Sequence, residues 1–199
     1  MAYRTTLRDG REIGIAEAEL QRFAGAIGLD QIAPGRYSKL FVFKLILYVH
    51  FEGVEGHFIL DQLRALEGLP NNAPATKTAT MFARDPLKGL WHQHFFSARF
   101  LAHNMLNQIG GDKLMPIVER IFDPEKSQTV TREMINELAN VTTIDAIRQR
   151  EAEGKLTGEW IVFAKHQGQN YYLTLAVHPE DKAGDMALYE ELKAMPFKG

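Results

Sequence analysis

The sequence predicts an α+β fold, with a mostly helical N-terminal two-thirds, a late antiparallel β-hairpin at about 159–178 and a C-terminal helix. Apolar residues recur at helical spacing through much of the chain before residue 150. Between Gly158 and His178, two runs rich in aromatic and β-branched residues flank a polar break that contains glycine, which is typical of a hairpin. Gly184 then sets off a last segment, Asp185 to Met195, that we expect to be helical.

Three helices are expected in the first third of the chain. Ile15 to Ile27 has apolar residues at helical spacing. Leu40 to Phe51 is almost wholly apolar and suits either a buried strand or a buried helix, and its length and the start signal at Ser38 favour the helix. His57 to Leu66 is amphipathic and precedes the breakers Gly68 and Pro70.

The middle of the chain combines a long loop with further helices. Asn71 to Gly89 has no clear periodicity and is expected to be irregular, as functional loops often are. Four helical segments are then predicted: Phe95 to Ile109, Lys113 to Phe122, Thr129 to Ala139 and Thr143 to Ala152. With 199 residues and 45% hydrophobic composition, we expect residues 1–199 to form a single domain around one core.

Composition excludes several classes of protein. The chain has no cysteine, which rules out disulfides, thiolate catalysis and cysteine-ligated metal sites and fits a cytoplasmic location. A net charge of −2 gives no overall footprint for nucleic acid, so any RNA would bind at a local patch. We expect no signal peptide and no membrane segment, because residues 40–51 are too short to span a bilayer and contain Lys44 and His50. The oligomeric state is not predicted.

The hairpin register follows from a turn centred on Gly168 and Gln169. It predicts one apolar face with the pairs Trp160–Val177, Val162–Leu175 and Ala164–Leu173. The opposite face is predicted to carry Ile161, Phe163 and Lys165 against Ala176, Thr174 and Tyr172, with His178 at its end. Such a face could bind phosphate and move a proton, although the wet outer side of an antiparallel sheet ordinarily carries these residue types as well.

Two histidines separated by one residue, His92 and His94, form the other candidate for chemistry. On an extended segment both imidazoles point the same way, so they could ligate a metal with His103 or His178 as a third ligand. No HExxH or histidine–carboxylate spacing accompanies them. We therefore expect neither metal nor cofactor.

Metal-free cleavage of RNA needs a base, an acid and a cation or donor for the phosphorane charge. The predicted catalytic residues are His92, His94, Lys165, Tyr172 and His178. The predicted substrate-binding residues are Lys77, Arg84, Lys88 and Thr174.

The cysteine-free chain with its late hairpin resembles small bacterial ribonuclease toxins in architecture, over roughly the last forty residues and without a shared motif. Such toxins are commonly basic, and this chain is not. The first hypothesis is an intracellular, nuclease-like hydrolase of a phosphate-bearing substrate, with its site between the 77–94 segment and the hairpin. The alternative is a non-enzymatic protein-binding module of the immunity or adaptor type, with residues 71–94 and the hairpin as interface. An enzyme should have a pocket with converging histidines, and a module should have an apolar patch.

Overall fold

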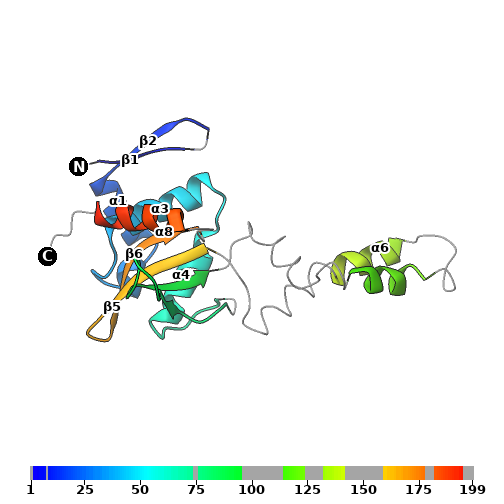
Figure 1. The fold of residues 1–199 in the computed structure, drawn as a ribbon. Helices are drawn as coiled ribbons and strands as arrows, with labels where there is room; N and C mark the ends of the chain where they lie inside the picture. Colours follow the sequence, from blue (N-terminus) through cyan, green and yellow to red (C-terminus); the bar gives the residue numbers. More distant parts are fainter. Residues whose placement is uncertain are drawn as a thin grey trace.

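The computed structural model describes residues 2–7, 9–73, 76–95, 114–123, 132–141, 159–177 and 182–194. Helices and antiparallel sheets occur together, so the α+β prediction is confirmed (Figure 1). The strands are β1 (Ala2–Thr6), β2 (Glu12–Ala16), β3 (Thr80–Met81), β4 (Trp91–Phe95), β5 (Glu159–His166) and β6 (Gln169–Ala176). The labelled helices are α1 (Glu17–Ala26), α2 (Leu29–Ile32), α3 (Lys39–Phe51), α4 (Gly56–Leu66), α6 (Arg132–Ala139) and α8 (Lys182–Lys193), and residues 114–121 form a further helix.

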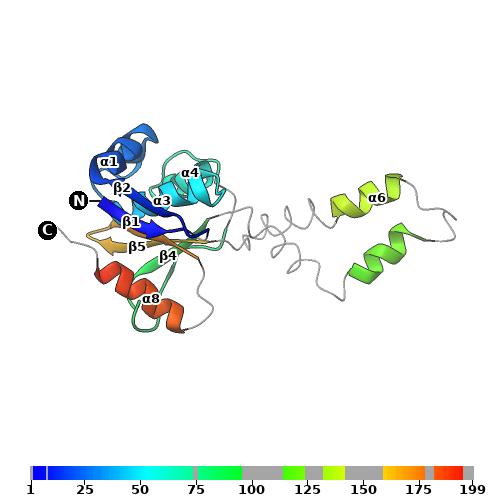
Figure 2. The ribbon, with the colours of Figure 1, turned by 90° about the horizontal axis from the view of Figure 1, so that it is seen from above.

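A four-stranded sheet in the order β3-β4-β5-β6 is the centre of the fold. The buried helix α3 covers one of its faces, where Phe41 lies against Tyr172 with ring centroids 6.0 Å apart. α8 covers the other face, where Leu188 and Leu192 join the same apolar cluster as Trp160. Viewed from above, the sheet forms a middle layer between α3 and α8 (Figure 2).

The helix predicted at 40–51 is confirmed as α3. The Ser38 side chain caps it by accepting a hydrogen bond from the Phe41 backbone N–H over 2.9 Å. Nearly every position of α3 from Leu40 to Tyr48 is buried. A helix that is apolar all round needs neighbours on several sides, and the sheet, α1 and α4 supply them.

The hairpin at about 159–178 is confirmed, but its predicted register is wrong. The turn consists of Gln167 and Gly168, both with positive φ (49° and 77°), one residue earlier than predicted. Lys165 therefore pairs with Asn170, and Phe163 with Tyr172. An irregularity between Val162 and Phe163 then shifts the register again, so that Val162 pairs with Thr174.

Burial also corrects the prediction that one hairpin face is wet. Ile161, Phe163, Tyr172 and Thr174 are each 0% exposed. The first three pack in the α3 core, and the register puts Thr174 on the α8 face beside Val162. Since helices cover both faces, Lys165 at the strand end is the one described residue of that predicted face that keeps the expected exposure.

The N-terminal hairpin β1–β2 was not predicted, and it shortens the first helix, which begins at Glu17 rather than Ile15. Helices are confirmed at 114–121 and in α4, α6 and α8, whereas Phe95 belongs to β4. The helix at 114–121 and α6 are joined by Arg120 and Glu137, 3.3 Å apart. The helix predicted at 143–152, and most of that at 95–109, fall outside the described residues. The single-domain organisation stays a prediction. None of the described helices is long and apolar enough to cross a membrane.

Candidate functional site

The two central histidines lie side by side on β4, as the extended segment predicted. The ring centroids of His92 and His94 are 5.8 Å apart. Both rings pack against Trp160, at 4.5 Å and 6.1 Å, and His92 also contacts Phe82 at 4.6 Å. His94 is 5% exposed. The pair is thus part of an aromatic layer on the α8 side of the sheet.

The other predicted catalytic residues do not join this pair. Lys165 and Tyr172 lie on the opposite, α3 side of the sheet. The Lys165 ammonium sits 4.0 Å from the centre of the Trp91 ring, a cation–π contact. His178 is outside the described residues. The sheet therefore separates Lys165 and Tyr172 from the histidines, and the described members of the set form no common pocket.

The predicted substrate-binding residues are also spread out. Lys77, Arg84 and Lys88 are exposed in the segment that leads into and joins β3 and β4. Thr174 shares the histidine face, with Val162 between it and His92 across the strands. Among the described residues, no cluster of three or more histidine, aspartate or glutamate side chains could hold a metal ion.

Tyr172 has a structural partner, Glu67, at the end of α4. The Glu67 carboxylate accepts hydrogen bonds from the Tyr172 hydroxyl at 2.6 Å, from the Asn170 amide at 3.1 Å and from the Arg36 guanidinium. Burial raises the pKa of Glu67, but the hydrogen bonds from Arg36, Tyr172 and Asn170 and the Arg36 charge outweigh it and hold the pKa below its ordinary value. Burial and the bond to Glu67 raise the pKa of Tyr172. Tyr172 is therefore a neutral donor in a satisfied network.

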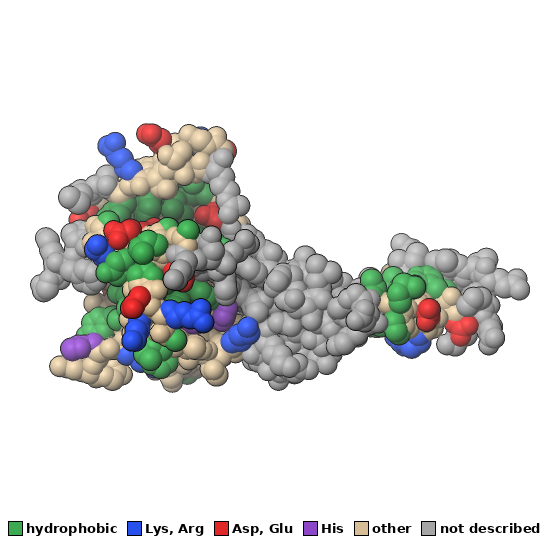
Figure 3. Space-filling model, in the orientation of Figure 1, with side chains coloured by type: hydrophobic (Ala, Val, Ile, Leu, Met, Phe, Trp, Pro, Cys, Tyr) green, Lys and Arg blue, Asp and Glu red, His purple; other side chains and the backbone are tan. Residues whose placement is uncertain are grey.

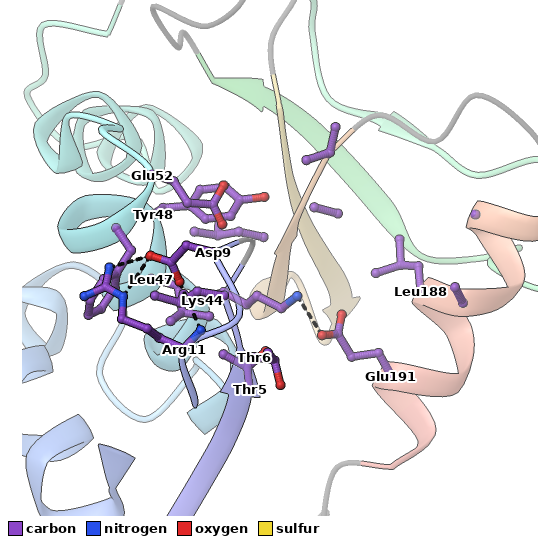
Figure 4. Close-up of a pocket in the computed structure, with 17 residues that line it drawn as sticks. Thr5, Thr6, Asp9, Arg11, Lys44, Leu47, Tyr48, Glu52, Leu188 and Glu191 are labelled. Atoms are coloured by element: carbon purple, nitrogen blue, oxygen red, sulfur yellow. Dashed lines mark hydrogen bonds and ion pairs between the residues drawn. The ribbon is translucent and has the colours of Figure 1, made fainter. Parts of the chain in front are cut away.

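A hollow of about 670 Å³ lies at the free edge of β6, away from the histidines (Figure 4). Its lining comes from the β1–β2 hairpin, from α3, from α8 and from residues 175–177. Because α3 and α8 cover opposite faces of the sheet, a space that both helices line lies at the margin of the sheet, here beside the end of β6. We call this space the edge groove.

The β6 edge is covered along only part of its length. Near its start, the Tyr172 N–H donates to the Arg36 carbonyl and the Ser38 N–H donates to the Tyr172 carbonyl, both at 2.8 Å. The Ser38 hydroxyl donates to the Leu173 carbonyl. From residue 174 to residue 177, no described backbone outside the hairpin pairs with β6. In the described part of the chain, this stretch beside the edge groove is thus an open strand edge.

The edge groove is apolar with charges of both signs. Leu47, Leu175 and Leu188 line it, and at its margin Phe51 and Val177 are 43% and 47% exposed. An ion pair between Lys44 of α3 and Glu191 of α8, 2.7 Å apart, joins the two helices across the edge, as Figure 4 shows. In the space-filling view, apolar side chains show beneath the β1–β2 hairpin, with charges of both signs scattered around them (Figure 3).

The chain matches no family model, no curated protein and no solved structure. A proposal about its function therefore rests on the geometry of its own residues.

Proposed function

We propose that the protein is a binding module whose edge groove takes an extended segment of a partner protein as an added strand beside β6. The observation that carries the proposal is that no described residue pairs with the backbone of 174–177 on the side away from β5, next to a groove with apolar walls. Unpaired strand edges are templates for another chain, and main-chain hydrogen bonds then supply affinity. This is the binding-module hypothesis with its interface at β6 rather than at residues 71–94.

The walls favour a peptide of alternating character. An added strand directs successive side chains to opposite faces, so one set would meet α3 and the other α8. Leu47 and Leu188 offer apolar contacts on the two sides. Lys44 and Glu191 offer one charge of each sign to a peptide that carries both.

The Lys44–Glu191 ion pair protects the edge in the unbound protein. Both side chains are partly exposed, at 27% and 33%, and such ion pairs contribute only about 0–1 kcal/mol. A partner strand that forms several backbone hydrogen bonds can therefore displace it at small cost. A cytoplasmic location, which a cysteine-free chain fits, is part of the proposal.

Selection from a displayed library of ten-residue peptides on the purified protein tests the proposal. Selected peptides should alternate apolar and polar residues and, in NMR spectra, slow the hydrogen exchange of the backbone amides at 174–177 that point away from β5. Ala187→Trp places a bulky ring in the groove wall and should weaken binding about tenfold or more. Ala183→Trp, on the same helix but outside the groove lining, is the matched control and should bind normally.

Two results would overturn this proposal. One is a library that yields no peptide whose binding is blocked by Ala187→Trp. The other is a set of bound peptides that contact residues 71–94 and leave the 174–177 amides unchanged.

A metal-free hydrolase of a phosphate-bearing substrate, such as RNA, is the second candidate. The observation in its favour is the pair of imidazoles on one side of β4. Incubating labelled RNA with the wild type and with His94→Ala tests it. Cleavage by the wild type that His94→Ala loses would support the enzyme, and intact RNA in both reactions would exclude this candidate.

A further inference from the structure

A second hollow, of about 300 Å³, lies between α4 and the loop that leads to β3. We call it the amide pocket, because its polar lining is uncharged: Gln62, Asn71, Thr76, Thr78 and Gln93. Its other described lining residues are alanines and one leucine. A neutral ligand with hydrogen-bonding groups suits such a lining better than an ion does.

One wall of the amide pocket is already fixed by hydrogen bonds. The Gln93 side-chain N–H donates to the Thr76 hydroxyl at 2.7 Å and to the Lys77 carbonyl at 2.8 Å. The Thr76 hydroxyl donates in turn to the His94 carbonyl at 3.0 Å. Gln93 is therefore held in place by β4 and the loop.

Gln62, which lines the amide pocket from α4, differs from Gln93 in its hydrogen bonding. It is 7% exposed, and its side-chain oxygen has no hydrogen-bond partner in the part of the chain that the structure describes. A buried acceptor left unpaired costs about 1–3 kcal/mol. Of the other buried positions of α4, Ile59 and Leu63 are apolar and Asp61 is paired with Arg64 at 2.8 Å, whereas packing alone gives no reason for an amide at position 62.

We infer that the amide pocket binds a small neutral group that presents an N–H donor beside an acceptor, as a primary amide or a nucleobase edge does. The Gln62 amide carries an acceptor and donors side by side, and once the side chain turns toward the pocket this arrangement pairs with such an edge through two hydrogen bonds. The volume is at the small end for ligand pockets, which suits a base or a single amide side chain. This inference is independent of the edge groove.

Calorimetric titration of the full chain with adenosine and with the dipeptide glycylglutamine tests the inference. The wild type should bind at least one of the two probes. Binding of adenosine would identify the recognised group as a nucleobase edge, and binding of glycylglutamine would identify it as a primary amide. Gln62→Leu keeps the volume but removes the amide, and should weaken binding about tenfold or more. Gln21→Leu, an exposed glutamine on α1, should bind as the wild type does.

Thermal melting gives a second readout that needs no ligand. Because Gln62→Leu removes an unpaired buried acceptor, we expect its melting temperature to equal or exceed that of the wild type. A melting temperature several degrees lower would mean that the Gln62 amide serves the fold, and would overturn the inference. The absence of binding of both probes up to about 10 mM, or equal binding by Gln62→Leu, would overturn it as well.

Discussion

The Tyr172 hydroxyl donates a hydrogen bond to the Glu67 carboxylate over 2.6 Å, although the two residues are 105 positions apart in the chain. The contact fastens the end of α4 to β6. Asn170 reinforces the junction, because its amide donates both to Glu67 and to the Leu66 carbonyl. The junction therefore joins the helical and the sheet parts of the core.

Removing the hydroxyl from Tyr172 should weaken this junction. Tyr172→Phe keeps the buried ring but loses a hydrogen bond to a charged acceptor, so we expect a loss of about 1.5–3 kcal/mol in the free energy of unfolding. Tyr171→Phe is the natural control, since the Tyr171 hydroxyl has only a long, exposed contact of 3.5 Å with Gln169. Urea denaturation of both variants measures the difference, and equal losses would contradict the structural role of Tyr172.

The lowered pKa of Glu67 predicts a loss of stability in acid. In the unfolded chain Glu67 has the ordinary glutamate pKa of about 4.3. In the folded chain its pKa is lower, so the carboxylate resists protonation at that pH. The stabilising contribution is therefore complete above the unfolded pKa and is lost as pH falls through the lower folded pKa.

Glu67→Gln isolates this effect. At neutral pH we expect it to cost about 2 kcal/mol or more, because Arg36 loses its charged partner. The difference in the free energy of unfolding between Glu67→Gln and the wild type should become smaller below about pH 4. Glu190→Gln, at an exposed ion pair with Lys193, should show neither behaviour in denaturation curves at several pH values. If the difference in unfolding free energy between wild type and Glu67→Gln stays constant down to pH 2, the lowered pKa of Glu67 is contradicted.

Thr174 and Trp160, both buried on the α8 side of the hairpin, should both be sensitive to mutation. Thr174→Ala removes a fully buried side chain and should cost about 1–2 kcal/mol, whereas a wet face predicts almost no effect. Trp160→Ala should cost about 3–5 kcal/mol through the cavity it leaves. Thr78→Ala, at an exposed threonine, serves as the control in chemical denaturation. If Thr174→Ala matches this control, the observed register is in error.

The Lys165 ammonium should stabilise the fold through its cation–π contact with the Trp91 ring. Lys165→Ala removes the cation–π contact and should lower stability by about 0.5–1 kcal/mol, as expected at an exposed site. Lys165→Arg should restore most of it, and Lys88→Ala should change nothing. Tryptophan fluorescence, to which Trp91 at this site and Trp160 both contribute, follows the denaturation. Phosphate binding that depends on Lys165 would instead return this residue to the phosphate-binding role predicted from the sequence.

Sequence reasoning succeeded where local signals decide structure. Ser38 marked the start of α3, and aromatic and β-branched runs marked β5 and β6. It missed β1–β2, although Asp9 and Gly10 form a turn signal between segments with alternating apolar residues. That signal competed with a helical pattern that runs on into α1.

The register failed for a different reason. A turn with two positive φ angles usually contains Asn, Asp or Gly, and Gln167 gives no such indication. The irregularity opposite Val162 has no local sequence mark either. The edge groove could not be predicted from the sequence, because it forms only when residues from both ends of the chain lie together.

The distance between Ser38 and Leu173 along the chain has a consequence during synthesis. Their hydrogen bond joins positions 135 residues apart. At about 5–20 residues per second, a ribosome needs roughly 7–27 s to make that stretch. Until synthesis is complete to this point, the apolar surface of α3 is not covered by the finished β5–β6 hairpin that helps to bury it. Chaperones protect such transiently exposed apolar surfaces. Nascent chains stalled before Glu159 should be cut by protease within residues 39–51, whereas the released chain should resist.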